Sequence, residues 1–295
     1  MRTHFFSSQG LNPRKKGCRI WFLKHELAST LTYPPKLSFH GEVFMMLDQV
    51  KNLSYQMRLF GIQQACERRA AEAFSQQLHP LEFLRLLLEE ELLSRKDRTA
   101  KALVTKARFR FRADLEDLDL TFHKDLSKAK IKELSELGFL HNLENLLILG
   151  KTGLGKTHLA IALGKRLCQE GHPTQFLPVN FLFEEIQAAR AAGRYLLYVR
   201  SLIKPKVLIL DDLGLRNYTH EEATSLMDIL EERYRKAPLI VTSQVEPQGW
   251  LKLFEDPVIG EAIVDRLIHP SQKITLKGDK SYREKLSEKK AGLKN

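Results

Sequence analysis

The sequence predicts an α/β protein in which helices flank a parallel sheet, with an all-helical segment in front of it. Two observations support this fold class. From Asn145 onward, short apolar runs of strand length alternate with longer stretches of helical spacing, which is the pattern of parallel strands joined by crossover helices. Between Leu47 and about Ala107, apolar residues keep a helical spacing that only Gly61 and Pro80 interrupt.

The strand and helix assignments follow from this alternation. We expect strands at NLLIL, TQFLPV, KVLIL, PLIVT and KITL. We expect helices at KTHLAIALGKRLCQEG, NFLFEEIQAARAAG and HEEATSLMDILEERYRK, and a long loop after PLIVT. The helical segment should hold two or three helices that turn at QLHPLE.

These patterns divide the chain into four parts. Residues 1–44 are basic, lack a clear periodicity and are expected to be a poorly ordered extension. Residues 45–112 form the N-terminal helical domain, residues 113–278 form the α/β domain, and residues 279–295 form a basic C-terminal tail.

Composition limits the classes of protein that need to be considered. The 295 residues can bury a sizeable core, and 43% hydrophobic with 28% charged residues is typical of globular proteins. The net charge of +11 favours a polyanionic partner such as nucleic acid or an anionic membrane, with solubility alone as the alternative. No apolar run approaches the roughly 20 residues that span a bilayer, so we expect no membrane anchor and no signal peptide.

The three cysteines are far apart and form no C-x-x-C pair. This spacing favours a reducing, cytoplasmic compartment over a disulfide framework or a zinc site. The basic, acid-poor start of the chain also has some character of a transit peptide, which is the alternative localisation.

The stretch GKTGLGKTH, residues 150–158, fits the P-loop pattern G-x-x-x-x-G-K-[ST] and lies between an expected strand and an expected helix, as that motif requires. Its glycines let successive N–H groups form a nest for phosphate oxygens, to which the helix N-terminus adds its positive end. Lys156 would add a charge at the β and γ phosphates, and Thr157 would offer a hydroxyl to Mg²⁺. The predicted nucleotide-binding residues are Gly150, Lys151, Thr152, Gly153, Leu154, Gly155, Lys156, Thr157 and His158. A glycine-rich turn without a ligand is the alternative.

A pair of acids strengthens the prediction of a nucleoside triphosphate site. Asp211 and Asp212 end the apolar strand of KVLILDDLG, and a buried strand would bring them beside the glycine loop. The first carboxylate can hold the Mg²⁺ shell together with Thr157, and the second can orient and deprotonate water. We therefore predict an ATPase that uses ATP and Mg²⁺, with Lys156, Asp211 and Asp212 among its catalytic residues.

Two further residues are candidates for the reaction. Gln244 ends PLIVTSQ together with Thr242 and Ser243, and these polar groups could touch the γ-phosphate or the attacking water. Arg266 in IVDRLIH could act as an arginine finger on the nucleotide of a neighbouring subunit, where it would stabilise the charge of the transition state. A salt bridge to Asp265 or a surface position is the alternative for Arg266.

With these motifs assembled, the chain resembles the AAA+ ATPases of the IstB group, which are ATP-binding helper proteins of IS21-type transposons and are related to helicase loaders of the DnaC type. The resemblance covers about residues 46–285 and rests on NLLILGKTGLGKTHLAIALG, PKVLILDDLGL, VTSQ followed by Trp250, DRLIH and ITLKG. It implies an AAA+ core behind an N-terminal helical domain, and ATP-controlled homo-oligomers on duplex DNA, with nucleotide between subunits, that engage a transposase. It also implies that Asp211 holds Mg²⁺, Gln244 is the first sensor and Arg266 is the finger.

The chain departs from the AAA+ pattern in two respects. Most AAA+ proteins have Asp-Glu where this chain has Asp-Asp, so the shorter Asp212 predicts slow activation of water, although Asp-Asp is familiar within the IstB group. The 19 residues after Leu276 are too few for the helical lid that usually carries a second sensor arginine, so none is assigned.

The segment SRKDRTAKALVTKARFRFR, residues 94–112, is the predicted DNA-binding stretch. Eight Lys or Arg side chains against one acid suit a run of phosphates along a duplex groove, with a solvated helix face as the alternative. Phe109 and Phe111 are expected to be core anchors and not base-stacking platforms. The predicted DNA contacts are Arg95, Arg98, Lys101, Lys106, Arg108 and Arg110.

Two other functions stay open at this point. A helicase loader of the DnaC type shares the ATPase core but acts on a protein ring, and some such loaders carry zinc ligands that this cysteine-poor chain lacks. A DNA-binding scaffold in which the ATP site is vestigial is the other alternative.

Overall fold

A computed structural model of the chain describes residues 39–118, 126–278 and 282, with side chains from Met45 onward. The chain divides into two compact units, residues 1–83 and residues 84–295. Most of the predicted extension 1–44 lies outside the described residues, as does the predicted tail 279–295 except for Tyr282. The predicted boundary after residue 112, between the helical domain and the α/β domain, stays a prediction.

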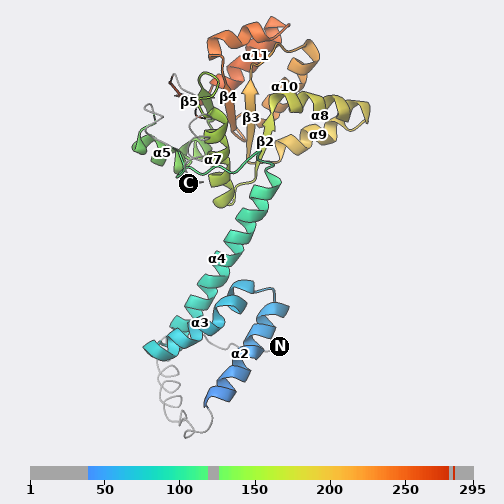
Figure 1. The fold of residues 1–295 in the computed structure, drawn as a ribbon. Helices are drawn as coiled ribbons and strands as arrows, with labels where there is room; N and C mark the ends of the chain where they lie inside the picture. Colours follow the sequence, from blue (N-terminus) through green and yellow to red (C-terminus); the bar gives the residue numbers. More distant parts are fainter. Residues whose placement is uncertain (1–38, 119–125, 279–281, 283–295) are drawn as a thin grey trace, which may run out of the picture. The chain divides into compact units, whose positions relative to one another are not determined.

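The first unit is helical, as predicted. Helix α2 spans Phe39–Gln56, α3 spans Phe60–Gln76, and α4, Pro80–Lys106, begins in this unit and continues into the second (Figure 1). The turn before α4 falls at the expected position, with Gln77 in the left-handed conformation. Helix α2 starts inside the segment that was expected to be poorly ordered.

The sheet of the second unit confirms the predicted α/β class. It has five strands in the order β2-β3-β4-β1-β5, and every neighbouring pair is parallel. Helices lie on both faces of the sheet (Figure 1). The strands are β1 (Asn145–Leu149), β2 (Thr174–Pro178), β3 (Val207–Leu213), β4 (Leu239–Ser243) and β5 (Ser271–Thr275).

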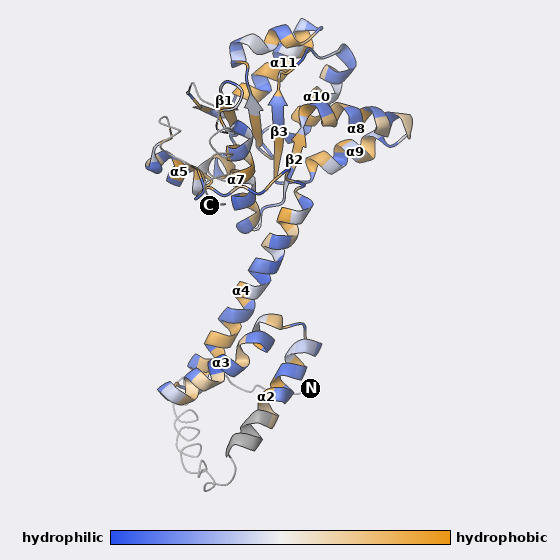
Figure 2. Cartoon of the chain, in the orientation of Figure 1, coloured by the Kyte–Doolittle hydropathy of each residue, from blue (hydrophilic) through white to orange (hydrophobic). Residues whose placement is uncertain are grey.

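The two faces of the sheet carry two separate hydrophobic cores because strand side chains alternate in direction. In β1, Leu146 and Ile148 belong to the core that includes residues of α5 (Lys128–Ser135), α6 (Gly138–His141) and α7 (Lys156–Gln169). Leu147 and Leu149 belong to the core on the other face, which includes residues of α8 (Val179–Ala191), α9 (Tyr195–Ile203), α10 (His220–Arg233) and α11 (Pro257–Ile268). Strands β1, β3 and β4 are buried along nearly their whole length, as expected for a parallel sheet covered on both faces, and Figure 2 shows that the head of β3 is hydrophilic.

The expected long loop after β4 is the main error in the predicted elements. The structure has a 3₁₀ helix, Pro247–Leu253, and then helix α11 in this region. The Asp256 carboxylate caps α11 by accepting bonds from the N–H groups of Val258 and Ile259, at 2.9 and 3.2 Å. Within the described ranges, no helix is long and apolar enough to cross a bilayer.

Candidate functional site

The glycine loop lies between the carboxyl end of β1 and the start of α7. Gly150, Gly153 and Gly155 have φ values of 144°, 83° and 83°, which side chains with a Cβ rarely adopt. A Cβ on Gly150 would also lie 2.5 Å from the Leu276 carbonyl oxygen. The loop therefore requires glycine at these positions, and its backbone can turn N–H groups toward a bound phosphate.

Lys156 begins α7 and is buried, with 5% of its surface exposed. Its Nζ donates a hydrogen bond to the Lys151 carbonyl oxygen at 3.0 Å, so the ammonium group is folded back over the loop. Leu154 anchors the loop in the hydrophobic core. A flexible lysine held over a rigid glycine loop can exchange this carbonyl for a phosphate oxygen.

Asp211, at the carboxyl end of β3, lies next to the loop as predicted. Its Oδ1 accepts hydrogen bonds from the hydroxyls of Thr157, at 2.9 Å, and Thr242, at 2.7 Å. Its Oδ2 is buried and has no hydrogen-bond partner among the described residues. Burial, and next to it the charge of Asp212, raises the pKa of the Asp211 carboxyl.

A divalent cation fits this arrangement. An unsatisfied buried carboxylate oxygen costs free energy, and a cation next to the Thr157 hydroxyl would remove that cost. Oxygen ligands of this kind are those that Mg²⁺ prefers.

Asp212 has an unusual backbone conformation. Its φ is 62°, and the register between β3 and β4 shifts between Leu210 and Leu213. The Asp212 N–H donates to the Thr242 hydroxyl at 2.8 Å, which holds the bulge in place. The bulge leaves the Asp212 side chain half-buried beside the fully buried Asp211, and strained conformations of this type cluster at functional sites.

The polar residues at the end of β4 have two different kinds of contact. Thr242 and Ser243 are fully buried, and the Ser243 hydroxyl donates to the Leu213 carbonyl and accepts from the Trp250 indole N–H at 3.2 Å. Gln244, by contrast, accepts a hydrogen bond from the Thr152 hydroxyl of the glycine loop. The structure thus joins Gln244 to the loop and assigns Thr242 and Ser243 to internal support.

Arg266 lies near the amino ends of the strands, at the opposite end of the sheet from the glycine loop. It is in the last turn of α11, just before the amino end of β5, whereas the glycine loop follows the carboxyl end of β1. Its Nε donates to the Glu231 carboxylate at 2.6 Å, and its Nη1 donates to the Ala262 carbonyl. The ion pair is therefore with Glu231 and not with Asp265.

An aromatic cluster near the loop was not predicted. The His158 ring lies 5.9 Å from the Phe111 ring and 5.5 Å from the Tyr282 ring, between centroids. The Tyr282 N–H donates to the Gly153 carbonyl oxygen at 2.7 Å, so this residue of the tail contacts the glycine loop. Burial lowers the pKa of His158, which keeps the ring neutral. No local motif links these three residues, so sequence patterns could not have found the cluster.

The predicted DNA-binding residues divide into two groups. Arg95 and Arg98 are paired with the buried Glu91, at 2.6 and 3.5 Å, and Lys101 is paired with Asp97. The other three, Lys106, Arg108 and Arg110, are exposed.

The two phenylalanines of this stretch differ. Phe109 packs against a core cluster, as predicted. Phe111 is 44% exposed and contacts His158 instead of anchoring the core.

The fold and the site together define a class. A parallel sheet of this strand order, a glycine loop after β1, an acid at the end of β3 and a polar residue at the end of β4 are the features of a P-loop AAA+ core. The chain belongs to the family of IstB-like ATP binding proteins, whose model matches residues 52–290.

Its relatives come from bacterial insertion sequences. The chain is 34% identical over 252 residues to the protein of Pseudomonas aeruginosa that is named as an ATP-binding protein of insertion sequence IS21, covering 85% of this chain and 91% of that one. It is 34% identical to the corresponding IS5376 protein of Geobacillus stearothermophilus, covering 68% and 80%. A third relative, from Mycobacterium tuberculosis, is 32% identical, with coverage of 79% and 93%.

Among solved structures, the AMPPCP-bound replication initiator DnaA of Aquifex aeolicus shares the fold. Its TM-score is 0.50 with 20% sequence identity, covering 62% of this chain and 56% of that one. This likeness supports the AAA+ fold.

Proposed function

We propose that the protein is a Mg²⁺-dependent ATPase that assembles on duplex DNA and assists a transposase. The observation that carries the ATPase part is the buried, unpartnered Oδ2 of Asp211 next to the Thr157 hydroxyl and the glycine loop. The family's ATP binding supports ATP as the nucleotide.

Each residue of the site has a role in this proposal. The N–H groups of the loop bind the phosphates, and Lys156 leaves the Lys151 carbonyl to contact the β and γ oxygens. Thr157 and Asp211 would hold Mg²⁺, which when bound supplies positive charge to the phosphate oxygens.

The remaining residues act on the attacking water. Asp212 accepts its proton, and Gln244, already bonded to Thr152 of the loop, orients the water or contacts the γ-phosphate. Because Asp212 is shorter than the glutamate of most AAA+ proteins, we expect slow hydrolysis.

The position of Arg266 supports a homo-oligomer. The five-residue strand β1 separates the amino edge of the sheet from the carboxyl edge by about 15 Å at 3.3 Å per residue. Arg266 therefore acts on the nucleotide of a neighbouring copy and not on its own. In this role it stabilises the charge that develops in the transition state.

Duplex DNA and a transposase are the partners in this proposal. The exposed cations of residues 94–112 and the net charge of +11 support DNA. The insertion-sequence names of the relatives described above support a transposase, and they favour it over the replicative helicase that a loader of the DnaC type would engage.

The test measures ATP hydrolysis by the purified protein with Mg²⁺, with and without duplex DNA. We expect DNA to stimulate hydrolysis, and Lys156→Ala to abolish hydrolysis while DNA binding without nucleotide persists. Lys236→Ala is the matched control, because Lys236 is exposed, is paired with Glu232 and lies before the amino end of β4, away from the glycine loop. Hydrolysis that Lys156→Ala does not change would contradict the proposal, and a vestigial ATP site would give no hydrolysis at all.

A capture experiment tests the partner. Immobilised protein with ATP and duplex DNA is offered the transposase of the same insertion sequence and the replicative helicase of the host in equal amounts. We expect retention of the transposase, and preferential retention of the helicase would favour the loader instead.

A further inference from the structure

We propose that Arg235 is a second cationic residue of the face that carries Arg266, and that both contact the triphosphate of a neighbouring copy of this chain. This inference rests on the proposed function and extends it, because none of the sequence motifs described above includes Arg235.

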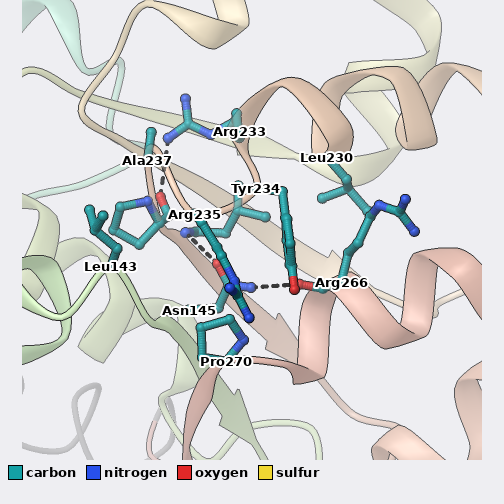
Figure 3. Close-up of a pocket in the computed structure, with 11 residues that line it drawn as sticks. Leu143, Asn145, Leu230, Arg233, Tyr234, Arg235, Ala237, Arg266 and Pro270 are labelled. Atoms are coloured by element: carbon teal, nitrogen blue, oxygen red, sulfur yellow. Dashed lines mark hydrogen bonds between the residues drawn. The ribbon is translucent and has the colours of Figure 1, made fainter.

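Arg235 and Arg266 line the same small pocket at the amino edge of the sheet (Figure 3). Arg235 follows α10 and precedes β4, whereas Arg266 ends α11 and precedes β5. These strands are the two hydrogen-bonded neighbours of β1, so both arginines lie at the edge opposite to the glycine loop. The pocket between them has a volume of about 10 Å³, which is room for one water and not for a ligand. A ligand that both arginines contact would therefore have to lie outside this pocket, and a neighbouring molecule can present it.

The three arginines near this pocket differ in what holds their guanidinium groups. Arg233 is buried and donates to the carbonyl oxygens of Leu202, Ile203, Pro205, Lys206 and Pro238. Arg266 is held by Glu231 and by the Ala262 carbonyl, which fixes its direction. Arg235 is exposed, and within the described part of the chain its guanidinium has no carboxylate partner. It lies 5.4 Å from the centre of the Tyr234 ring.

The backbone at Arg235 is also unusual. Its φ is 54°, in the left-handed region that is unfavourable for a residue with a Cβ and that glycine adopts freely. This position directly follows the C-terminus of α10, where glycine is the common choice. An arginine at this position carries a cost in local stability that glycine would avoid.

The chemistry of the two side chains indicates a polyphosphate. A planar guanidinium presents paired N–H donors that match phosphate oxygens. Two such groups at one edge suit a ligand with several phosphates, and the glycine loop at the opposite edge of the next copy presents one. Repetition of this contact would place Arg266 and Arg235 of one copy at the nucleotide held by Lys156 and Asp211 of another.

The unusual backbone provides a sharp variant. Arg235→Gly removes the side chain and relieves the left-handed conformation, so the variant should fold as well as the wild type. We expect it to bind a fluorescent ATP analogue with unchanged affinity as a free protomer, and to lose at least 10-fold in the maximal rate of DNA-stimulated hydrolysis. Lys236→Ala is the matched control, because Lys236 is the next residue, equally basic, exposed and paired with Glu232.

A mixed-subunit assay distinguishes action on a neighbour from other roles. Arg235→Gly protomers keep their own nucleotide site, and Lys156→Ala protomers keep an intact arginine face. We expect a mixture of the two to hydrolyse ATP faster than either alone, because a complete site forms where they meet. Wild-type rates in Arg235→Gly, or no gain on mixing, would overturn the inference.

The remaining outcomes are also decisive. If Arg235→Gly only weakened duplex binding and reduced its salt dependence, Arg235 would contact DNA phosphates and the inference would be wrong. If the wild-type protein itself showed no hydrolysis with Mg²⁺ and DNA, the proposed function would fail first, and this inference with it.

Discussion

At the scale of single residues, the buried carboxyl of Asp211 has an unfavourable free energy that a bound cation would reduce. Its carboxyl is fully buried, and burial raises its pKa. A raised pKa in the folded state means that the contribution of this carboxyl to stability is complete below the unfolded pKa and is lost as pH rises through the folded pKa. The ionised carboxylate therefore lowers the free energy of unfolding at neutral pH when no cation is bound.

The substitution Asp211→Asn tests whether the ionised carboxylate destabilises the protein. Without nucleotide and in EDTA, we expect the variant to melt at the same temperature as the wild type or higher at pH 7 to 8, with the difference shrinking toward about pH 4, near the usual carboxyl pKa. With ATP and Mg²⁺, the wild type should gain thermal stability and the variant should gain much less, while hydrolysis falls by about 100-fold. Asp212→Asn removes the neighbouring charge that also raises the pKa of Asp211, so it should weaken the pH dependence of the wild type without abolishing it, because the burial of Asp211 remains. If Asp211→Asn melted several degrees below the wild type at neutral pH without nucleotide, the buried carboxylate would not be destabilising.

Residue-scale predictions from the sequence succeed where the signal is local. The glycine loop and Asp211 are adjacent to their strands in sequence, so the motif already contains the geometry. The partner of Arg266 is Glu231 and a partner of His158 is Tyr282, and both contacts join distant segments. No spacing rule relates such residues, because only the packed fold brings them together.

At the scale of elements, the strands and helices α7, α8 and α10 could be predicted, whereas no helix was expected at α9 or at α11. Helix α11 shows the reason most clearly. Its N-terminal signal, Asp256 followed by Pro257, is present in the sequence. The internal Gly260 has the character of a breaker, but a Cβ there would lie 3.0 Å from the Phe254 side chain. The glycine is present for close packing, and that reason becomes visible only in the folded protein.

Arg233 joins the end of α9 to the segment that leads into β4, and this link can be tested. Arg233 donates to carbonyl oxygens from both, among them those of Leu202 and Pro238, and burial lowers the pKa of its guanidinium to about 10, so it stays charged at neutral pH. Arg233→Met keeps most of the volume but leaves buried carbonyls without donors, at a cost of about 3 kcal/mol or more. Urea denaturation with an unchanged slope should report this loss. Arg235→Gly, two residues away, should stay within about 1 kcal/mol of the wild type, and equal effects of the two substitutions would refute the distinction.

At the scale of the whole molecule, composition predicted a polyanionic partner but could not say which cations are available to it. The structure divides the predicted set, because Arg95, Arg98 and Lys101 are already paired with acids. Lys106, Arg108 and Arg110 are exposed at and beyond the end of α4. A cation that already has a carboxylate partner releases fewer counterions from DNA than one that has none.

The salt dependence of duplex binding should separate the two groups. Each full phosphate contact contributes about 0.9 to the slope of log affinity against log salt, so loss of three would reduce the slope by about 2.7. We expect Lys106→Ala, Arg108→Gly and Arg110→Ala together to approach this reduction, with glycine chosen because Arg108 has a φ of 58°. The triple change of Arg95, Arg98 and Lys101 to Ala should reduce the slope by less than half as much, when both variants are titrated with the same labelled duplex over a range of salt. Equal reductions would mean that DNA breaks the pairs with Glu91 and Asp97, and no reduction in either would place the duplex on another surface of the protein.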